Sequence, residues 1–207
     1  ACFGELSGWE RANWFLPEEA VNAGKTAAYE YSWKRQNWFD YSAAEHLAVR
    51  QSVGLFDMSS FGKIKLVGRD AEAVLQRIAA NDVAVPIGKI VYTQFLNEAG
   101  HIEADVTITR LADDEFLVVT PAATIRRDLH WITSHIPDDA HAHAIDITIS
   151  ESVLVVMGPH ARQFLQPLIP QSLANDDFAF GTMQPIEIGH AVGTVSYTHL
   201  RAHETNQ

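Results

Sequence analysis

The chain has 207 residues, of which 47% are hydrophobic, and a formal net charge of −11. Its length suits one large domain or two small ones, and its apolar fraction is ordinary for a protein with a core. The acidic balance disfavours nucleic acid and anionic membrane surfaces as main partners, although a local basic pocket could still bind a small anion. The single cysteine, Cys2, excludes a disulfide within the chain. We also expect no signal peptide at the start, and no membrane-spanning helix because no apolar run is long enough.

Residues 1–41 are rich in tryptophan and lack clean periodicity. Trp9, Trp14, Trp33 and Trp38 stand among charged residues. Aromatic side chains at this density usually pack against a larger body. The segment is therefore either a wrapping segment on the surface of its own domain or an interface to another domain, and the pattern leaves both open.

The region that follows is predicted to contain two helices with two strands between them. Ser42-Ala43-Ala44-Glu45 has the spacing of a capping box, whose side chains satisfy free amide donors at a helix start. This spacing predicts a helix that ends at Gly54. Strands are predicted over residues 55–58 and within SSFGKIKLVG, and a second helix capped by Asp70 is predicted through Ile78.

A β-hairpin is predicted over residues 90–109. Apolar and polar side chains alternate up to residue 96 and again from residue 102, and Asn97-Glu98-Ala99-Gly100 stands between the two runs. Asparagine and glycine favour turns because both tolerate positive φ. Asp105 lies in the second strand, where it must face a polar site, a partner or solvent because burial of an unpaired charge is costly. The pattern alone favours the solvated face.

The second half of the chain is predicted to mix strands and helices in irregular order. The predicted elements are a strand over 116–120, a helix from Thr120-Pro121 to Ile132, strands over 144–149 and 153–157, and a helix after Gly158-Pro159. Because no regular βαβ alternation is present, the fold class is predicted to be α+β, with antiparallel sheets and packed helices.

Several kinds of chemistry have no sequence support. His130 and His135 miss the spacing of one helix face, and His141 and His143 have no further ligand nearby, so no metal site is predicted. No G-x-G-x-x-G motif follows a strand and no G-x-S-x-G motif is present. The chain is therefore expected to contain neither a nucleotide or flavin site nor a serine nucleophile of that type.

Three stretches resemble one known family. YTQFLNEAGHIEADVTIT and VRQSVGLFDMSSFGKIKLVGRDAEAVLQ are similar to the aminomethyltransferase family. This family includes the T-protein of glycine cleavage and the folate-binding C-terminal half of dimethylglycine and sarcosine dehydrogenases. FGELSGWERANWF resembles the segment that opens this folate-binding half, and stand-alone T-proteins lack it. The resemblance therefore favours the dehydrogenase branch and implies its folate-binding fold, incomplete at the C-terminus.

The resemblance implies one catalytic residue, Asp105. In the T-protein pattern the turn is followed by two glycines and then by a pair of acids. Asp105 matches the second acid, which the family uses against the folate, whereas His101 replaces the second glycine and Ala104 replaces the first acid. The resemblance reverses the expectation of a solvated position, and we expect the carboxylate to face a cavity.

The resemblance also implies three folate-binding residues, which are Tyr92, Tyr197 and Phe61. The two tyrosines would offer ring surface and hydroxyl groups to the pterin or its aryl tail. Phe61 stands where family members place an apolar residue that contacts folate. For all three, an ordinary packed aromatic side chain is the structural alternative.

The resemblance divides the chain into three parts. Residues 1–41 form the tryptophan-rich segment that leads to a flavin domain missing from this chain, and residues 42–197 form part of the folate-binding domain. Residues 198–207 form a tail that departs from the family, because the acids expected after Tyr197 are absent. The chain is therefore expected to be a truncated fragment that is inactive alone.

The implied function is transfer of a one-carbon unit from an N-methyl amine to tetrahydrofolate, which gives 5,10-methylenetetrahydrofolate. Folate and the amine-derived iminium would be the small-molecule partners, and FAD would be bound only by the missing N-terminal half. Two alternatives remain: a stand-alone T-protein and a folate-binding module without transfer chemistry. The expected location is the cytoplasm of a bacterium or the mitochondrial matrix of a eukaryote.

Overall fold

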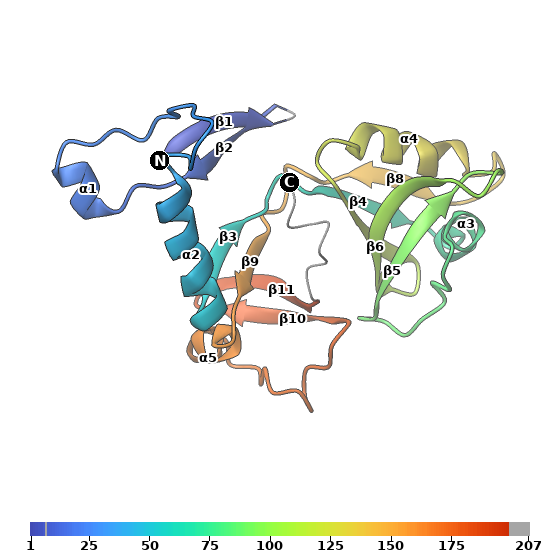
Figure 1. Cartoon of the computed structure of the whole chain (residues 1–207). Helices are drawn as coiled ribbons and strands as arrows, with labels where there is room; N and C mark the ends of the chain where they lie inside the picture. Colours follow the sequence, from blue (N-terminus) through green and yellow to red (C-terminus); the bar gives the residue numbers. More distant parts are fainter. Residues whose placement is uncertain (7, 199–207) are drawn as a thin grey trace. The chain divides into compact units, whose positions relative to one another are not determined.

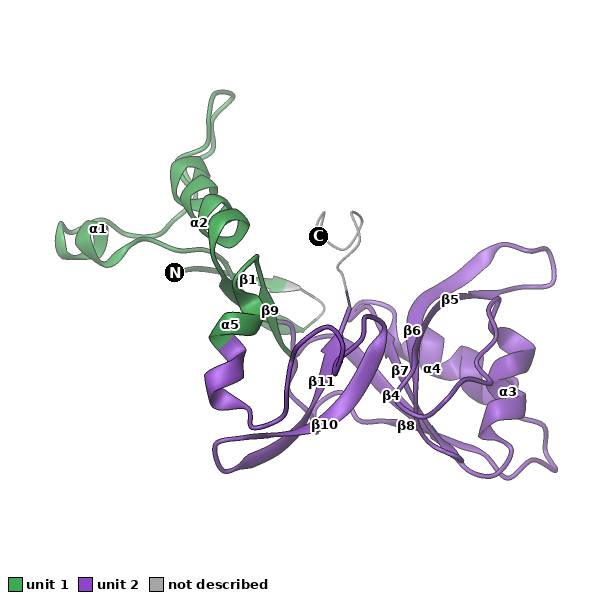
Figure 2. Cartoon of the chain, turned by 90° about the horizontal axis from the view of Figure 1, so that it is seen from below, with its two compact units in different colours: residues 1–57, 154–164 green, residues 58–153, 165–207 purple. Residues whose placement is uncertain are grey.

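The computed structural model describes residues 1–6 and 8–198. The chain forms two compact units (Figures 1 and 2), one made of residues 1–57 and 154–164 and the other of residues 58–153 and 165–207. All strand pairs between named strands are antiparallel, and helices pack on the largest sheet. The predicted α+β class is therefore confirmed.

The second unit is built on a five-stranded antiparallel sheet with the strand order β5-β6-β7-β4-β8. Strands of this sheet are joined by hydrogen-bonded ladders that extend along most of each strand. The strands are β4 (Gly62–Val67), β5 (Ile90–Leu96), β6 (Ile102–Ala112), β7 (Glu115–Thr120) and β8 (His143–Asp146).

One face of this sheet carries the main hydrophobic core. Side chains alternate between the two faces of a strand, so Ala104, Val106 and Ile108 all point to the same side and are buried. Helices α3 (Ala71–Ile78) and α4 (Ile125–Ser134) cover that side. The core also contains Ile64, Leu66, Val74, Leu75, Ile78, Val83, Phe95, Phe116, Val118, Ile132 and Ala142.

The predicted hairpin is confirmed as β5 and β6. Gly100 has φ +78°, and the amides of Ala99 and His101 both donate to Asn97 Oδ1 at 3.0 Å. The turn therefore depends on the two residue types that predicted it. Within the five-stranded sheet, β5 is an edge strand and β7 is the middle strand.

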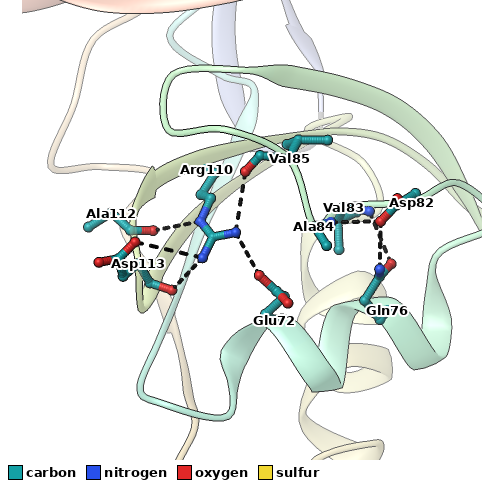
Figure 3. Close-up of polar contacts among 9 residues, drawn as sticks. All are labelled: Glu72, Gln76, Asp82, Val83, Ala84, Val85, Arg110, Ala112 and Asp113. Atoms are coloured by element: carbon teal, nitrogen blue, oxygen red, sulfur yellow. Dashed lines mark hydrogen bonds and ion pairs between the residues drawn. The ribbon is translucent and has the colours of Figure 1, made fainter.

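Two side chains hold the loop between α3 and β5 (Figure 3). Arg110 on β6 donates to Glu72 Oε2 at 2.6 Å and to the Val85 carbonyl oxygen at 3.3 Å. Gln76 on α3 accepts a hydrogen bond from the Val83 amide at 3.0 Å and donates to Asp82 Oδ1 at 2.6 Å. The loop is thus tied to both its neighbours, which fixes the entry of the chain into β5.

A second small cluster in this unit lies beside the last two strands. It comprises Ile169, Leu173, Phe178 and Ile186, and Tyr197 packs against it. The elements here are η1 (Gln166–Leu168), β10 (Thr182–Ile188) and β11 (Ala191–Tyr197), with β10 and β11 forming a hairpin.

The first unit contains two strand pairs and the longest described helix of the chain. Strand β1 pairs with β2, and β3 pairs with β9. Its elements are β1 (Cys2–Leu6), β2 (Trp9–Trp14), α1 (Glu18–Asn22), α2 (Phe39–Gln51), β3 (Gly54–Asp57) and β9 (Leu154–Met157), and α5 (Ala161–Leu165) begins in it. The N-terminal hairpin was not predicted, because its aromatic and charged residues show no clean alternation.

Two predicted helix starts are wrong. Helix α2 begins at Phe39 with Trp38 as its N-cap, so Ser42 lies inside the helix and forms no capping box. Helix α4 begins at Ile125, not at Pro121, and residues 121–124 form a turn closed by the Thr124 amide and the Pro121 carbonyl at 3.1 Å. Neither N-cap residue, Trp38 or Thr124, forms a side-chain capping hydrogen bond. Among residues 1–6 and 8–198, no helix is long and apolar enough to cross a membrane.

Candidate functional site

The sheet of the second unit has a second face, which points away from α3 and α4. Strand register places Tyr92 opposite Thr107, Thr107 opposite Val119, and Val119 opposite Lys63. Directly paired residues share a face, so these four side chains form one row across four strands. The neighbouring positions on each strand belong to the buried core, which assigns the row to the second face.

Asp105 lies on this second face, directly opposite Gln94. The Gln94 side-chain amide donates to Asp105 Oδ1 at 3.1 Å, and both residues are partly buried. The carboxylate therefore has a hydrogen-bond partner and is only partly exposed. The alternation alone favoured a solvated position. Gln94 was not predicted as a site residue, and its position opposite Asp105 follows only from the strand register.

Tyr92 is brought close to Asp105 by the hairpin. It is half-buried and precedes Gln94 by two positions, so it shares the face of Asp105 as a diagonal neighbour across the strand pair. Diagonal neighbours lie within reach of aromatic and long side chains. The structure thus places two of the four predicted site residues beside each other.

Phe61 lies at the same end of the sheet as Asp105. It immediately precedes β4, whose first residue, Gly62, is opposite Thr120. Asp105 lies two residues before Thr107, which is opposite Val119, so both Phe61 and Asp105 stand just beyond the Lys63 to Tyr92 row. Phe61 is half-buried in a turn that its amide closes on the Met58 carbonyl at 3.0 Å.

Tyr197 lies off this sheet. It ends β11, and its ring packs near those of Phe178 and Phe180 at centroid distances of 5.8 and 5.6 Å. Its carbonyl oxygen accepts a hydrogen bond from the Gly181 amide at 2.8 Å, and the Gly181 carbonyl accepts one from Ile90 at 2.9 Å. The tyrosine is thus linked to the start of β5 through the backbone, while its ring belongs to the small cluster.

Lys63 is a residue of this face that the sequence did not identify. Its side chain is only 2% exposed, and its Nζ donates to the carbonyl oxygens of Ser59 at 3.0 Å and Phe61 at 2.9 Å. Burial lowers the pKa of Lys63, while the negative charges of Glu151 and Asp146 act in the opposite direction. The alternation Lys-Ile-Lys-Leu is typical of a solvated strand face, so no local signal distinguished this lysine from Lys65.

A buried polar cluster lies at the start of α4. Asp128 is 1% exposed and accepts hydrogen bonds from the hydroxyl groups of Thr120 and Thr124 and from Arg127 Nε. All four residues bond within the protein, which makes this cluster a structural element. In the part of the chain that the structure describes, no group of three or more His, Cys, Asp or Glu residues could hold a metal ion.

One hollow in the described part of this unit lies away from Asp105. It is lined by residues of α3 and the turn before it and by the segment after α4, among them Arg69, Arg77, His135 and Asp139. None of the predicted site residues lines it. The expectation that Asp105 faces a ligand cavity therefore stays a prediction, as do the ligand contacts of Tyr92, Tyr197 and Phe61.

Comparison with known proteins identifies the family. The family model described as the GCVT N-terminal domain matches residues 1–201. The chain is 41% identical over 193 residues to 4-methylaminobutanoate oxidase (formaldehyde-forming) of Paenarthrobacter nicotinovorans, covering 92% of this chain and 23% of that protein. It is 33% identical over 199 residues to the mitochondrial dimethylglycine dehydrogenase of Mus musculus, covering 94% of this chain and 22% of that protein.

A solved structure shares the fold. The glycine cleavage system aminomethyltransferase T from Bartonella henselae superposes with a TM-score of 0.62 at 24% identity, over 81% of this chain and 46% of that chain. The chain spans less than a quarter of the length of the two curated relatives above. The family model covers nearly the whole chain, and the solved structure has the same fold. This chain therefore belongs to the GCVT N-terminal domain family and has the aminomethyltransferase fold.

Proposed function

We propose that the second face of the sheet binds tetrahydrofolate and supports capture of a one-carbon unit from an N-methyl amine. The observation that carries this proposal is the half-buried Asp105, paired with Gln94 and next to Tyr92 on one sheet face. In this proposal, residues 42–197 form the folate-binding part of a protein similar to dimethylglycine and sarcosine dehydrogenases. Residues 1–41 lead to a flavin domain, and residues 198–207, of which only Thr198 is described, form a tail outside the domain.

The chemistry of these side chains fits a folate. A pterin ring has a flat apolar surface and an edge of N–H donors and acceptors. An ionised carboxylate is a pure acceptor, and a glutamine amide offers both a donor and an acceptor. A hydrogen bond to a charged group contributes about 1.5–3 kcal/mol, and Asp105 is sheltered enough from water to contribute in that range. Tyr92 and Phe61 would supply aromatic surface at the two sides of the carboxylate.

Asp105 would orient the folate and accept a proton during the transfer. Its carboxylate could accept a hydrogen bond from a folate nitrogen, stabilise cationic character in the amine-derived iminium, or take the proton released as the new C–N bond forms. A positioned acid or base of this kind typically contributes on the order of 10²–10⁴ in rate. Oxidation of the amine needs FAD, which we assign to a flavin domain outside this chain. The products would be 5,10-methylenetetrahydrofolate and the amine without its methyl group, which leaves as the second bond from carbon to a folate nitrogen forms.

The test separates the two half-reactions in the protein that contains this chain together with its flavin domain. Asp105→Ala is expected to lower methylene transfer to folate by about 10² or more, because the positioned carboxylate is lost. Flavin reduction by the amine, measured by stopped-flow absorbance, should keep its wild-type rate. Glu98→Ala is the matched control, since Glu98 is an exposed acid in the turn of the same hairpin.

Other results of these experiments would favour one of the alternative functions. Equal slowing of flavin reduction and transfer in Asp105→Ala would show that the residue is not specific to the folate half-reaction. Folate binding without transfer in the wild type would favour a binding module. Transfer from a lipoyl-bound aminomethyl group without a flavin would favour a stand-alone aminomethyltransferase. The proposed location follows the source of the protein, the cytoplasm in a bacterium or the mitochondrial matrix in a eukaryote.

A further inference from the structure

We propose that Lys63 is a positioning residue that fixes the turn at residues 58–61 and thereby sets the place of Phe61 beside the folate. The part of the inference that concerns folate rests on the proposed function, whereas the part that concerns the turn rests on the structure alone. Lys63 does not need to touch the ligand, because it acts through the backbone of the turn.

The ammonium group of Lys63 is committed to the turn. Nζ donates to the carbonyl oxygens of Ser59 and Phe61 at 3.0 and 2.9 Å, and the side chain is 2% exposed. Burial of a lysine ammonium group is costly unless its N–H donors are hydrogen-bonded. Here, two of these donors bond to carbonyl oxygens of the same four-residue turn. The carbonyls of Ser59 and Phe61 flank the backbone of Ser60, and fixing both restricts the torsion angles that aim Phe61.

The backbone of Lys63 is anchored independently. Its amide donates to Thr148 Oγ1 at 3.1 Å, and its carbonyl oxygen accepts a hydrogen bond from the Ile147 amide at 2.8 Å. Thr148 is 8% exposed, so this anchor is shielded from water. The lysine is therefore a fixed point from which the side chain can hold the turn.

The rest of the turn is tied to the segment around Val153. The Met58 amide donates to the Val153 carbonyl at 2.9 Å, and the Val153 amide donates to Ser59 Oγ at 3.1 Å. The Phe61 amide closes the turn on the Met58 carbonyl. These bonds hold Met58 and Ser59 at the start of the turn, whereas Lys63 donates to the Ser59 and Phe61 carbonyl oxygens. Lys63 thus supplies the contact that holds the Phe61 end.

Lys65 provides a matched control on the same strand. It lies two residues after Lys63 on the same face, and its Nζ pairs with Glu115 at 2.7 Å. Its side chain is 31% exposed. Lys65→Met therefore removes the same charge and the same donor group as Lys63→Met without touching the turn. Methionine keeps the apolar stem of the lysine side chain, so the packing around the stem is preserved and both variants should fold.

The experiment measures the turn and the folate separately in the protein with its flavin domain. Hydrogen exchange of the Phe61 amide should become faster by about tenfold in Lys63→Met, because the turn opens more often, and should not change in Lys65→Met. The KM for tetrahydrofolate should rise by about tenfold in Lys63→Met while kcat at saturating folate is retained, since ground-state positioning is lost but Asp105 is intact. Flavin reduction by the amine should be unaffected.

A double-mutant cycle shows whether the effect passes through Phe61. If it does, Lys63→Met should add nothing to the KM change already caused by Phe61→Ala. Additive effects, or an unchanged KM in Lys63→Met with normal folate binding by the wild type, would overturn the inference. A wild-type protein that binds no folate would overturn the proposed function and the ligand contact of Phe61, and the exchange of the Phe61 amide alone would then decide whether Lys63 holds the turn.

Discussion

The two units, which Figure 2 shows in different colours, differ in how their apolar side chains are buried. In the second unit, α3, α4 and alternate positions on the sheet strands form one contiguous core. Among the described residues of the first unit, the only buried apolar side chains are Cys2 and Trp14, and α2 has no buried residue. Large side chains such as Trp33 and Tyr31 are almost fully exposed there.

The difference shows that regular spacing, more than aromatic content, determines where a core forms. In α3 the apolar residues Val74, Leu75 and Ile78 fall on one side of the helix and meet a strand face of period two. The tryptophans of the first unit follow neither period, and only Trp14 is buried, stacked on Tyr41 at 5.8 Å. Exposed aromatic surface of this extent is typical of interaction sites, which agrees with the proposed contact to a flavin domain.

The largest expected effect tests the core of the second unit. Phe95 is fully buried, and Phe95→Ala should lower the free energy of unfolding by about 3–5 kcal/mol, because it removes a large side chain and leaves a cavity. Denaturant unfolding followed by circular dichroism would measure it. Phe3→Ala in the first unit is the control, since Phe3 is 60% exposed and should cost less than about 1 kcal/mol. Equal losses in the two variants would contradict the contrast between the units.

A smaller effect is expected from the buried polar cluster of α4. Asp128→Ala removes the acceptor shared by Thr120 and Thr124 and should lower the free energy of unfolding by about 1–3 kcal/mol. Asp128→Asn keeps one acceptor oxygen and should cost less. The control is Asp138→Ala, in an exposed loop of the same unit. A neutral Asp128→Ala, measured by thermal unfolding, would mean that apolar packing alone distinguishes the units.

Loss of the Arg110 hydrogen bonds between β6 and the loop before β5 should destabilise that loop locally. Arg110→Met removes the contacts with Glu72 and the Val85 carbonyl and should cost about 1–2 kcal/mol, because these bonds involve charge but lie near the surface. Hydrogen exchange should become faster at residues 81–89 and stay slow in the core strands. Arg69→Met, at a side chain that is 71% exposed, should leave both unchanged. Uniformly faster exchange over the whole sheet would show that Arg110 supports the unit globally.

The smallest effect is a pH dependence at the start of α3. The pKa of Asp70 is lowered, first by the hydrogen bond that its Oδ2 accepts from the His141 amide at 2.7 Å. A depressed carboxyl pKa stabilises the folded state above the ordinary value of about 4, and this contribution is lost as the pH falls through the lowered value. The protection of the His141 amide against hydrogen exchange, relative to the intrinsic rate at the same pH, should therefore fall below that range, as NMR would show. Asp70→Asn should remove this pH dependence, and its persistence in that variant would assign it to another group.

Much of the second unit could be predicted from the sequence, because its signals are local. Alternation over residues 90–109 predicted the β5 and β6 hairpin, and Asn97 and Gly100 fixed its turn. The apolar spacing before Ile78 predicted α3. The irregular mixture of strands and helices predicted the α+β class, and the family followed from motifs in those same segments. Each of these depends on interactions within a few residues, which the order of amino acids specifies directly.

Only the tertiary structure decided which side chains meet. Gln94 and Asp105 face each other because of strand register. Tyr197 lies in another cluster, although the family resemblance grouped it with Asp105. Lys63 and Lys65 are equivalent in the alternation, yet one is buried on a turn and the other pairs with Glu115 near the surface. Burial and pairing depend on segments that are far apart in the chain. The local sequence of one segment therefore does not specify which other segment packs against it.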